Sequence, residues 1–376
     1  MHYFGGTSMQ KPFATTTGVF DTIYVFYPRG LRTGGPEALH QLVDALRKSG
    51  QQAFLVPFMG TEDAARVRDY EIYDAPEAPR AIDQAGNAVI VPEVWIDLLR
   101  EFTQAQRMCW WLSIDYSPVF RILRSRSDDK AGLGNEHKVK PRQYLKDYAI
   151  SVRPRRELVQ STLHLAQSHY AWAYLYAQLN VVPTLLGDYT PLFRIEGFRS
   201  DVANDRGRTV AYNPKKGSEL TERVIAKTSD IEWRPLIGMS ADDVCRSLAS
   251  TAIYLDLGQH PGKDRMPREA AYLGAVTIVA RRGAGAFTQD VPLPWQHKVQ
   301  PTDPHFLERT VALLDQVLAE PQAHRDSQNE YRSALLREKE VFFAEVQRAF
   351  VEGHFYSDSS ADLLPHGEAT QLETNS

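Results

Sequence analysis

The residues with the most evident chemistry lie in the segment 254–279, which reads YLDLGQHPGKDRMPREAAYLGAVTIV. Its apolar start predicts a buried strand, and Pro267 is expected to open a helix over 267–273. The loop between strand and helix carries four polar residues: His260, Lys263, Asp264 and Arg265. Ligands of open α/β sheets bind beyond the carboxyl ends of the strands, and the N–H groups of a helix N-terminus attract anions. The segment therefore predicts a site for an anionic ligand.

Glu269 adds a carboxylate in what would be the first turn of that helix. A carboxylate there can accept two hydrogen bonds from the hydroxyl groups of a ribose, while lysine and arginine neutralise a diphosphate. The alternative is that Glu269 only offsets the helix dipole and that the loop is a solvated surface turn. The density of polar groups in the loop favours the first interpretation.

Alternating strands and helices must position these residues. DTIYVFY at 21–27 predicts a strand, and a loop at 28–35, a helix at 36–49 and a strand at 52–58 complete a right-handed βαβ unit. A second α/β run begins near 208. We expect an α/β chain divided as follows: a flexible start at 1–19, Rossmann-like domains at 20–200 and 201–330, a closing helix at 331–356, and a disordered tail at 357–376.

Composition excludes several classes of protein. The chain has 376 residues, 43% of them hydrophobic, and a net charge of −4, so it lacks the overall positive field of a nucleic-acid-binding protein. Cys109 and Cys245 form no Cys-x-x-Cys pair, which favours a reducing compartment. The first twenty residues lack the pattern of an export signal, and no apolar run approaches about 18 residues. We therefore expect a cytoplasmic protein.

At this point the sequence resembles a known family. PREAAYLGAVTIV is similar to the donor-site helix of GT-B glycosyltransferases, TGGPEALHQL to their amino-terminal glycine-rich loop, and NPKKG at 213–217 to the start of their carboxy-terminal domain. The likeness covers nearly the whole chain in order, and it is closest to the transferases that build bacterial capsular and surface polysaccharides. It implies two Rossmann-like domains facing a cleft, a closing helix that packs back on the first domain, and transfer of a sugar from a nucleotide-activated donor to a glycan or lipid-linked acceptor.

Carried over by position, the resemblance implies that Glu269 holds the donor ribose. Lys216, with Lys215 or Lys263, would contact the diphosphate. The predicted donor-binding residues are Gly34, Gly35, Lys215, Lys216, His260, Lys263, Asp264, Arg265 and Glu269. No cofactor besides the donor is implied. No Asp-x-Asp, His-x-x-His or Cys/His cluster predicts a metal site either, which suits a family that uses lysine, arginine and helix dipoles in place of a metal ion.

The sequence departs from the family at one position. Many retaining members carry a second glutamate eight residues before the helix glutamate, and Pro261 stands there in this chain. Whether the sugar keeps its configuration therefore stays open. The pair His260–Pro261 also resembles the His-Pro motif of transferases that use CMP-activated sugars, which leaves a CMP donor as a second possibility.

An inverting enzyme needs a group in the first domain that takes the proton of the acceptor hydroxyl. Asp115, which follows the aromatic strand predicted at 108–114, is the first candidate, and Glu37 and His169 are the others. Each has a structural alternative: Asp115 can cap the turn before Pro118, and His169 can simply begin a helix.

The segment 117–156 contains eleven Lys/Arg and four Asp/Glu, a net charge of +7. It can bind an anionic acceptor or lipid head groups at the inner face of a membrane, which predicts peripheral contact there. The alternative is a solvated basic loop.

Three other classes stay open beside a transferase. They are a nucleotide-sugar epimerase or phosphorylase of the same fold, a non-catalytic sugar-binding protein, and a dinucleotide dehydrogenase. The last has little support, because PRGLRTGGPE lacks the G-x-G-x-x-G pattern.

Overall fold

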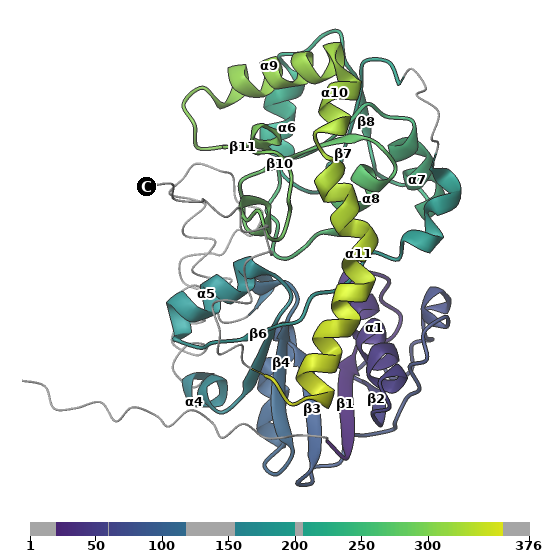
Figure 1. Ribbon diagram of the computed structural model, residues 1–376, viewed down its shortest axis with the longest axis vertical. Helices are drawn as coiled ribbons and strands as arrows, with labels where there is room; N and C mark the ends of the chain where they lie inside the picture. Colours follow the sequence, from purple (N-terminus) through teal and green to yellow (C-terminus); the bar gives the residue numbers. More distant parts are fainter. Residues whose placement is uncertain (1–19, 59, 118–154, 200–205, 356–376) are drawn as a thin grey trace, which may run out of the picture.

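The computed structural model describes residues 20–58, 60–117, 155–199 and 206–355. Figure 1 shows two α/β halves stacked along the long axis and one long helix, α11, that runs over both. The start at 1–19, the tail at 357–376 and most of the basic segment at 117–156 lie outside the described residues, so the expectations for them stay predictions. None of the helices in the described ranges has the length and apolar character needed to span a bilayer.

The first sheet has six strands in the order β2-β1-β3-β4-β5-β6, and every neighbouring pair is parallel. Its strands are β1 Thr22–Tyr27, β2 Ala53–Pro57, β3 Asn87–Pro92, β4 Gln106–Trp111, β5 Leu163–Ala166 and β6 Thr184–Leu185. Its α-helices are α1 Gly34–Lys48, α4 Arg155–Gln160 and α5 His169–Leu179. Because both faces are covered, the central strands are mainly apolar after their first one or two residues, as the run TIYVFY of β1 illustrates.

The second sheet has five parallel strands in the order β11-β10-β9-β7-β8. They are β7 Thr209–Tyr212, β8 Glu232–Pro235, β9 Ile253–Asp256, β10 Val276–Ala280 and β11 Lys298–Val299. Its helices are α6 Ser218–Ile225, α7 Ala241–Ala249, α8 Arg265–Tyr272, α9 Phe306–Ala319 and α10 Pro321–Asp326. The two sheets confirm the predicted α/β architecture. The short strands β6 and β11 were not expected from the sequence.

The two helices that matter most for the site begin two residues earlier than predicted. α1 begins at Gly34, so Pro36 is its third residue, and α8 begins at Arg265, so Pro267 is its third residue. Proline is tolerated there because none of the first N–H groups of a helix has an intrahelical acceptor. Glu269 consequently lies in the second turn of α8, and the prediction that it lies in the first turn was wrong.

Other boundaries also differ. The strand predicted at 108–114 ends at Trp111. The segment from Glu93 to Glu101 forms a 3-10 helix, η2. In place of the closing helix predicted at 331–356, the structure has α11 at Asn329–Val346, which α10 precedes, and a π-helical turn at Gln347–Val351.

Gln328 lies between α10 and α11, and its fully buried side chain explains the break between the two helices. Its side-chain amide accepts from the Thr277 N–H at 3.0 Å and donates to the Thr277 carbonyl at 2.8 Å, so it completes the ladder of β10 beyond the short β11. The same amide nitrogen lies 3.0 Å from Nδ1 of His297, whose Nε2 lies 2.9 Å from Nδ1 of His324. These contacts fix the position at which α11 begins, one residue after Gln328.

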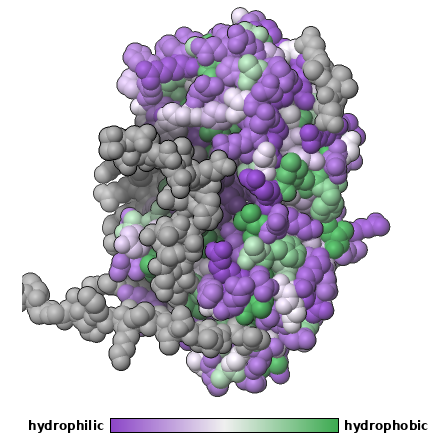
Figure 2. Space-filling view, in the orientation of Figure 1, coloured by the Kyte–Doolittle hydropathy of each residue, from purple (hydrophilic) through white to green (hydrophobic). Residues whose placement is uncertain are grey.

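α11 belongs to the cores of both halves. Tyr331 and Leu335 pack in the core of the second domain with residues of α7 and α8, whereas Phe342 and Val346 pack in the core of the first with residues of α1 and β1. The expectation that a closing helix packs back on the first domain is confirmed. The surface seen in Figure 2 is mainly hydrophilic, with hydrophobic side chains in small groups.

Arg268 of α8 joins the three parts of the molecule. Its buried guanidinium lies 3.0 Å from Asp188, which follows β6 in the first domain, and 3.1 Å from Glu338 of α11. Burial alone would lower the pKa of Arg268, but the two carboxylates raise it, so the arginine is held charged. Glu338 also accepts from the backbone N–H of Thr190 at 2.9 Å.

We expect Arg268→Met to lower the free energy of unfolding by roughly 3–5 kcal/mol, because it leaves two buried carboxylates without a counterion. Urea denaturation measures the loss. Arg337→Met, at an exposed position of α11, is the control and should cost less than about 1 kcal/mol. Adding Asp188→Leu and Glu338→Leu to Arg268→Met should restore part of the stability. An Arg268→Met protein as stable as the control would contradict this role.

Stability should also depend on pH through buried histidines. Burial lowers the pKa of His164 and of His297 to about 4, against about 6.5 in an unfolded chain. As pH falls below 6.5 the unfolded state therefore takes up protons first, and the folded state loses stability down to about pH 4. Each histidine should cost about 2 kcal/mol between pH 7 and pH 5.

Urea unfolding at these two pH values measures that difference. His297→Gln should reduce it, and His305→Gln, at an exposed position, should leave it unchanged. Equal pH dependence in parent and His297→Gln proteins would refute the assignment.

Candidate functional site

The carboxyl ends of the two sheets meet at the domain interface. The loop 257–264, which follows β9, contacts the ends of β4 and β5: the Ile114 N–H donates to the Pro261 carbonyl at 3.0 Å, and the Lys263 N–H donates to the Gln167 side chain at 2.9 Å. A Cβ on Gly262 would lie 2.2 Å from the Leu112 carbonyl oxygen, so only glycine permits this approach. The predicted loop is therefore part of an interface between domains.

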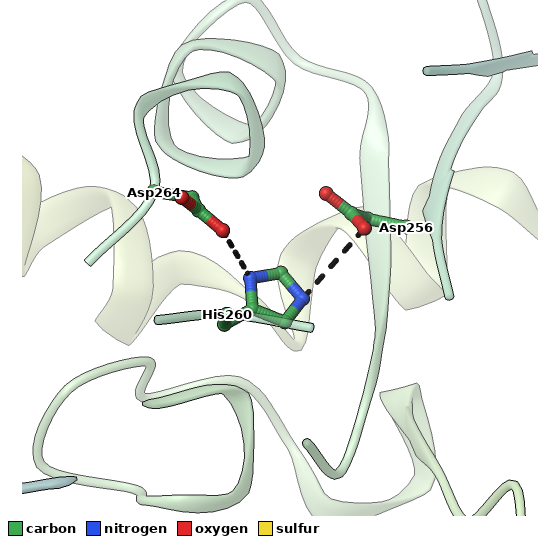
Figure 3. A group of neighbouring side chains, drawn as sticks. All are labelled: Asp256, His260 and Asp264. Atoms are coloured by element: carbon green, nitrogen blue, oxygen red, sulfur yellow. Dashed lines mark ion pairs between the residues drawn. The ribbon is translucent and has the colours of Figure 1, made fainter. Parts of the chain in front are cut away.

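Figure 3 shows how His260 lies between two carboxylates. Nδ1 of the buried imidazole is 2.9 Å from Asp264. Nε2 is 3.8 Å from Asp256, and no described residue forms a hydrogen bond with it. Asp256 ends β9, and Asp264 caps α8. A Cβ on Gly285 would approach the His260 ring to 2.9 Å, so the ring fills the space that this glycine leaves.

Lys216 completes the cluster from the loop after β7. Its ammonium lies 2.5 Å from Asp264. Burial alone would lower the pKa of Lys216, but Asp264 and Asp256 raise it. Burial alone would raise the pKa of Asp264, but Lys216 and His260 hold it well below its usual range. These groups form a chain of opposite charges.

The same three side chains, Asp256, His260 and Asp264, offer ligand atoms within 4.8 Å of one another, which is a spacing that could hold a metal ion. The geometry fits a metal poorly. The two ring nitrogens face different carboxylates, and Asp264 already binds Lys216. One ion cannot be bound by both nitrogens of one imidazole, so the cluster as it stands is better described as an ion-pair chain.

A second cluster joins the N-terminus of α1 to α8. Both carboxylate oxygens of the buried Glu37 are engaged: one lies 2.7 Å from Arg194 and accepts from the Tyr73 hydroxyl at 2.7 Å, and the other is paired with Arg265. Arg265 thus reaches across the interface to α1. Its side chain also passes Gly34, where an added Cβ would lie 3.5 Å from Nε. Nε and Nη2 of Arg265 are buried and have no acceptor among the residues that the structure describes.

Glu269 is half-buried and lies one helical turn after Arg265. Burial raises the pKa of its carboxyl group, and Arg265 and Arg268 oppose that shift. Among the described residues no hydrogen bond or ion pair of this carboxylate is present.

Asp115 lies in the 3-10 turn η3, Ile114–Tyr116, and is 2% exposed. Its carboxylate accepts from the Tyr170 hydroxyl at 2.7 Å and from the Gln259 side chain of the second domain at 2.6 Å. The turn is held by the buried Glu93, which accepts from the N–H groups of Leu112 and Ser113 at 2.9 and 3.0 Å. Burial raises the pKa of Glu93 to about 7, although these two N–H groups oppose the shift.

The other predicted residues, His169, Lys215 and Lys263, lie outside these two clusters of charged side chains. The N–H groups of His169 and Tyr170 donate to Asp290 of the second domain at 2.7 and 2.9 Å, and the His169 ring lies 3.2 Å from the same carboxylate. Lys215 is exposed. The Lys263 side chain lies beside Gly187 of the first domain.

Sequence reasoning missed the partners of these residues: Glu93, Asp188, Arg194, Asp256, Gln259, Arg268, Asp290 and Glu338. Most of them are single polar residues at expected strand ends, in turns or on helix surfaces, where a polar residue is ordinary and gives no signal of its own. Asp256, Gln259 and Arg268 belong to the segment 254–279 that the sequence analysis singled out, so an argument from near neighbours in the chain could have found them.

The comparisons concern fold alone. No protein-family model matches the sequence, and no curated protein matches it by sequence. Sucrose-phosphate synthase from Thermosynechococcus elongatus is structurally similar, with a TM-score of 0.60 and 12% identity over 88% of this chain and 98% of that one. TarM is similar with a TM-score of 0.50 and 9% identity, over 72% of this chain and 55% of that one. WaaG, a glycosyltransferase involved in lipopolysaccharide biosynthesis, has a TM-score of 0.49 and 12% identity, over 86% of this chain and 99% of that one.

The similarity to sucrose-phosphate synthase spans most of both chains, and it agrees with the two parallel sheets of this chain. Identities of this size establish a shared architecture and leave activity to be argued from the site. The chain has a two-domain GT-B fold.

We expect Asp264→Asn to lower the free energy of unfolding by about 2–4 kcal/mol, because Lys216 and His260 lose the carboxylate between them. Asp230→Asn is a matched control: Asp230 also forms an ion pair, with Arg208 at 2.8 Å, but its side chain is 64% exposed. That variant should lose less than about 1 kcal/mol. Similar losses in both proteins, measured by urea denaturation, would contradict a buried ion-pair chain.

Proposed function

We propose that the protein is a glycosyltransferase that moves a sugar from a nucleotide-activated donor to a glycan or lipid-linked acceptor in surface-polysaccharide synthesis. The observation that carries the proposal is the pair of buried N–H groups of Arg265, Nε and Nη2, which lie beside the N-terminus of α1 and have no acceptor in the described part of the chain. A buried guanidinium that faces a helix N-terminus favours an anion such as a diphosphate.

In this proposal Gly34 and Gly35 let the donor approach the backbone of α1. The N–H groups of these first helical residues have no intrahelical acceptor and point toward the ligand. Arg265 keeps one nitrogen on Glu37 and donates to the phosphate through the other two. Glu37 then serves as the residue that orients Arg265, since each of its oxygens is paired with an arginine, whereas Asp115 accepts from the neutral side chains of Tyr170 and Gln259. It is the least favoured of the three predicted bases.

Lys216 is proposed to contact the diphosphate from the other side. An ammonium group has three donors, so it can bind a phosphate oxygen while it keeps Asp264. His260 and Asp264 then position Lys216, and Lys263 and Lys215 add positive charge. These cations would stabilise the leaving diphosphate as charge develops on it, a role for which other transferases use a metal ion.

Glu269 is proposed to bind the donor ribose. Its half-buried carboxylate carries no hydrogen bond among the described residues and is one turn from Arg265, so it can accept from two neighbouring hydroxyl groups.

If the reaction inverts the sugar, Asp115 is proposed as the base. It lies where the two domains meet and is contacted by Gln259, the neighbour of His260 in the chain. His169 is the second candidate, because its side chain is 37% exposed, but it is paired with Asp290. The acceptor and the polysaccharide role rest on the sequence resemblance alone.

The first experiment measures the thermal unfolding of the purified protein with UDP, GDP, dTDP, ADP and CMP. A ligand at 100 times its dissociation constant should add about 2.7 kcal/mol to the stability. We expect one diphosphate to raise the melting temperature, and Glu269→Gln to reduce that rise because the ribose loses its acceptor. Glu219→Gln, at an exposed position of α6, should respond like the parent.

Each other outcome has a defined meaning. A shift with CMP alone would favour a CMP-sugar donor. A shift that Glu269→Gln leaves intact would remove the proposed role of Glu269. Conversion of a nucleotide-sugar without any acceptor would favour an epimerase. No shift with any nucleotide would overturn the proposal.

A further inference from the structure

Three arginines of the second domain gather where α8 ends. Arg206, which precedes β7, donates to the Leu273 carbonyl at 3.0 Å and to the Thr251 carbonyl at 2.9 Å. Nε of Arg325 on α10 donates to the Gly274 carbonyl at 3.0 Å. An added Cβ on Gly274 would lie 2.9 Å from Nη2 of Arg206, so the guanidinium groups of Arg206 and Arg325 contact the same residue.

Arg332 on α11 adds a third guanidinium group. Its Nη2 donates to the carbonyl of Arg325, and it donates to the Asn329 side chain at 2.7 Å. Its Nη1 is buried, and no described residue accepts from it. A buried N–H group without an acceptor costs free energy, so this one favours an oxygen ligand. We call Arg206, Arg325 and Arg332 the arginine cluster; all three are half-buried, so a small molecule can reach them from solvent.

The arginine cluster carries positive charge without a counterion in its contacts. Its acceptors are backbone carbonyls and side-chain amides, and none of its members forms an ion pair with a described residue. Burial and Arg325 lower the pKa of Arg206 to about 10. Burial and Arg325 also lower the pKa of Arg332, and the exposed Asp326 opposes that shift only in part. The three cations therefore repel one another, and an anion would stabilise them.

The arginine cluster is separate from the candidate site. Arg265 begins α8, whereas Leu273 follows the last residue of that helix, Tyr272. A helix of this length places its two ends about 12 Å apart. The carboxyl end of a helix carries a partial negative charge, which disfavours an anion. Here the carbonyls of Leu273 and Gly274 already accept from the arginines, and three full positive charges outweigh that partial charge.

We propose that the arginine cluster is a second anion site, which binds a small molecule that carries a phosphate group. A guanidinium group can donate two parallel hydrogen bonds to two phosphate oxygens, and a phosphate has enough oxygens for several arginines. The bound phosphate would accept from N–H groups that no described residue uses, and it would remove the repulsion within the cluster. The inference goes beyond the proposed function, because it requires neither a nucleotide nor a sugar.

The test is isothermal titration calorimetry with inorganic phosphate, at an ionic strength held constant with sodium chloride so that screening does not change. The parent protein should bind phosphate, and Arg325→Gln/Arg332→Gln should lower the affinity at least tenfold. Glutamine can still donate to a carbonyl, but it has neither the charge nor the planar fork of arginine. Arg337→Gln/Arg348→Gln is the matched control, since it removes the same charge from exposed positions. It should bind within about twofold of the parent.

Arg265→Gln separates this site from the candidate donor site. It should keep the phosphate binding that the Arg325→Gln/Arg332→Gln protein loses, and the latter should keep its nucleotide-induced shifts in melting temperature. Loss of phosphate binding in Arg265→Gln alone would overturn the inference and leave the proposed function standing. The inference would also fail if the parent bound no phosphate, or if the cluster variant and its matched control lost equal affinity.

A second measurement needs no variant and therefore does not depend on how a variant folds. Phosphate should slow the modification of Arg325 and Arg332 by phenylglyoxal at least threefold in the parent protein, because the bound anion covers their guanidinium groups. The rate at the exposed Arg337 should stay the same. Mass spectrometry of the peptides measures these rates, and equal rates at Arg332 with and without phosphate would contradict the site.

Discussion

The buried guanidinium of Arg268 is the interaction on which the arrangement of the molecule depends. It pairs with Asp188 of the first domain and Glu338 of α11, while its own helix belongs to the second domain. Buried ion pairs carry a large desolvation cost and are weak evidence for stability by themselves. Their effect here is geometric, because the guanidinium has one position that satisfies both carboxylates. This position sets where α8, and with it Arg265 and Glu269, faces the first domain.

Other polar contacts at the interface also join the two domains. Glu37 of α1 pairs with Arg265, and Asp290 binds the N–H groups that begin α5. Asp115 and Gln259 join the turn after β4 to the loop after β9. Each of these contacts joins a residue from one carboxyl edge to a residue from the other. The candidate site is thus built from both domains, and neither domain holds a complete set of its residues.

Several features were within reach of the sequence because they depend on near neighbours in the chain. The period of apolar residues in 21–58 predicted β1, α1 and β2, and the polar loop before α8 was predicted to lie beyond the carboxyl ends of the strands. Some wrong predictions also came from reasoning over near neighbours in the chain. Pro36 and Pro267 were both taken as the first residue of a helix, whereas each is the third, since proline fits any position of the first turn. The break before α11 depends on Gln328 reaching the backbone of Thr277, and nothing adjacent in the chain signals that contact.

The sequence alone predicted the class of fold and the order of most of its elements, because hydrophobic period, prolines and glycines act over a few residues. The partners of each charged group were decided only by the tertiary structure. Whether Glu37 is a free base or the counterion of two arginines depends on Arg194 and Arg265, which are 157 and 228 positions away. The energy of a charge depends on its burial and on the distance to opposite charges, and folding sets both.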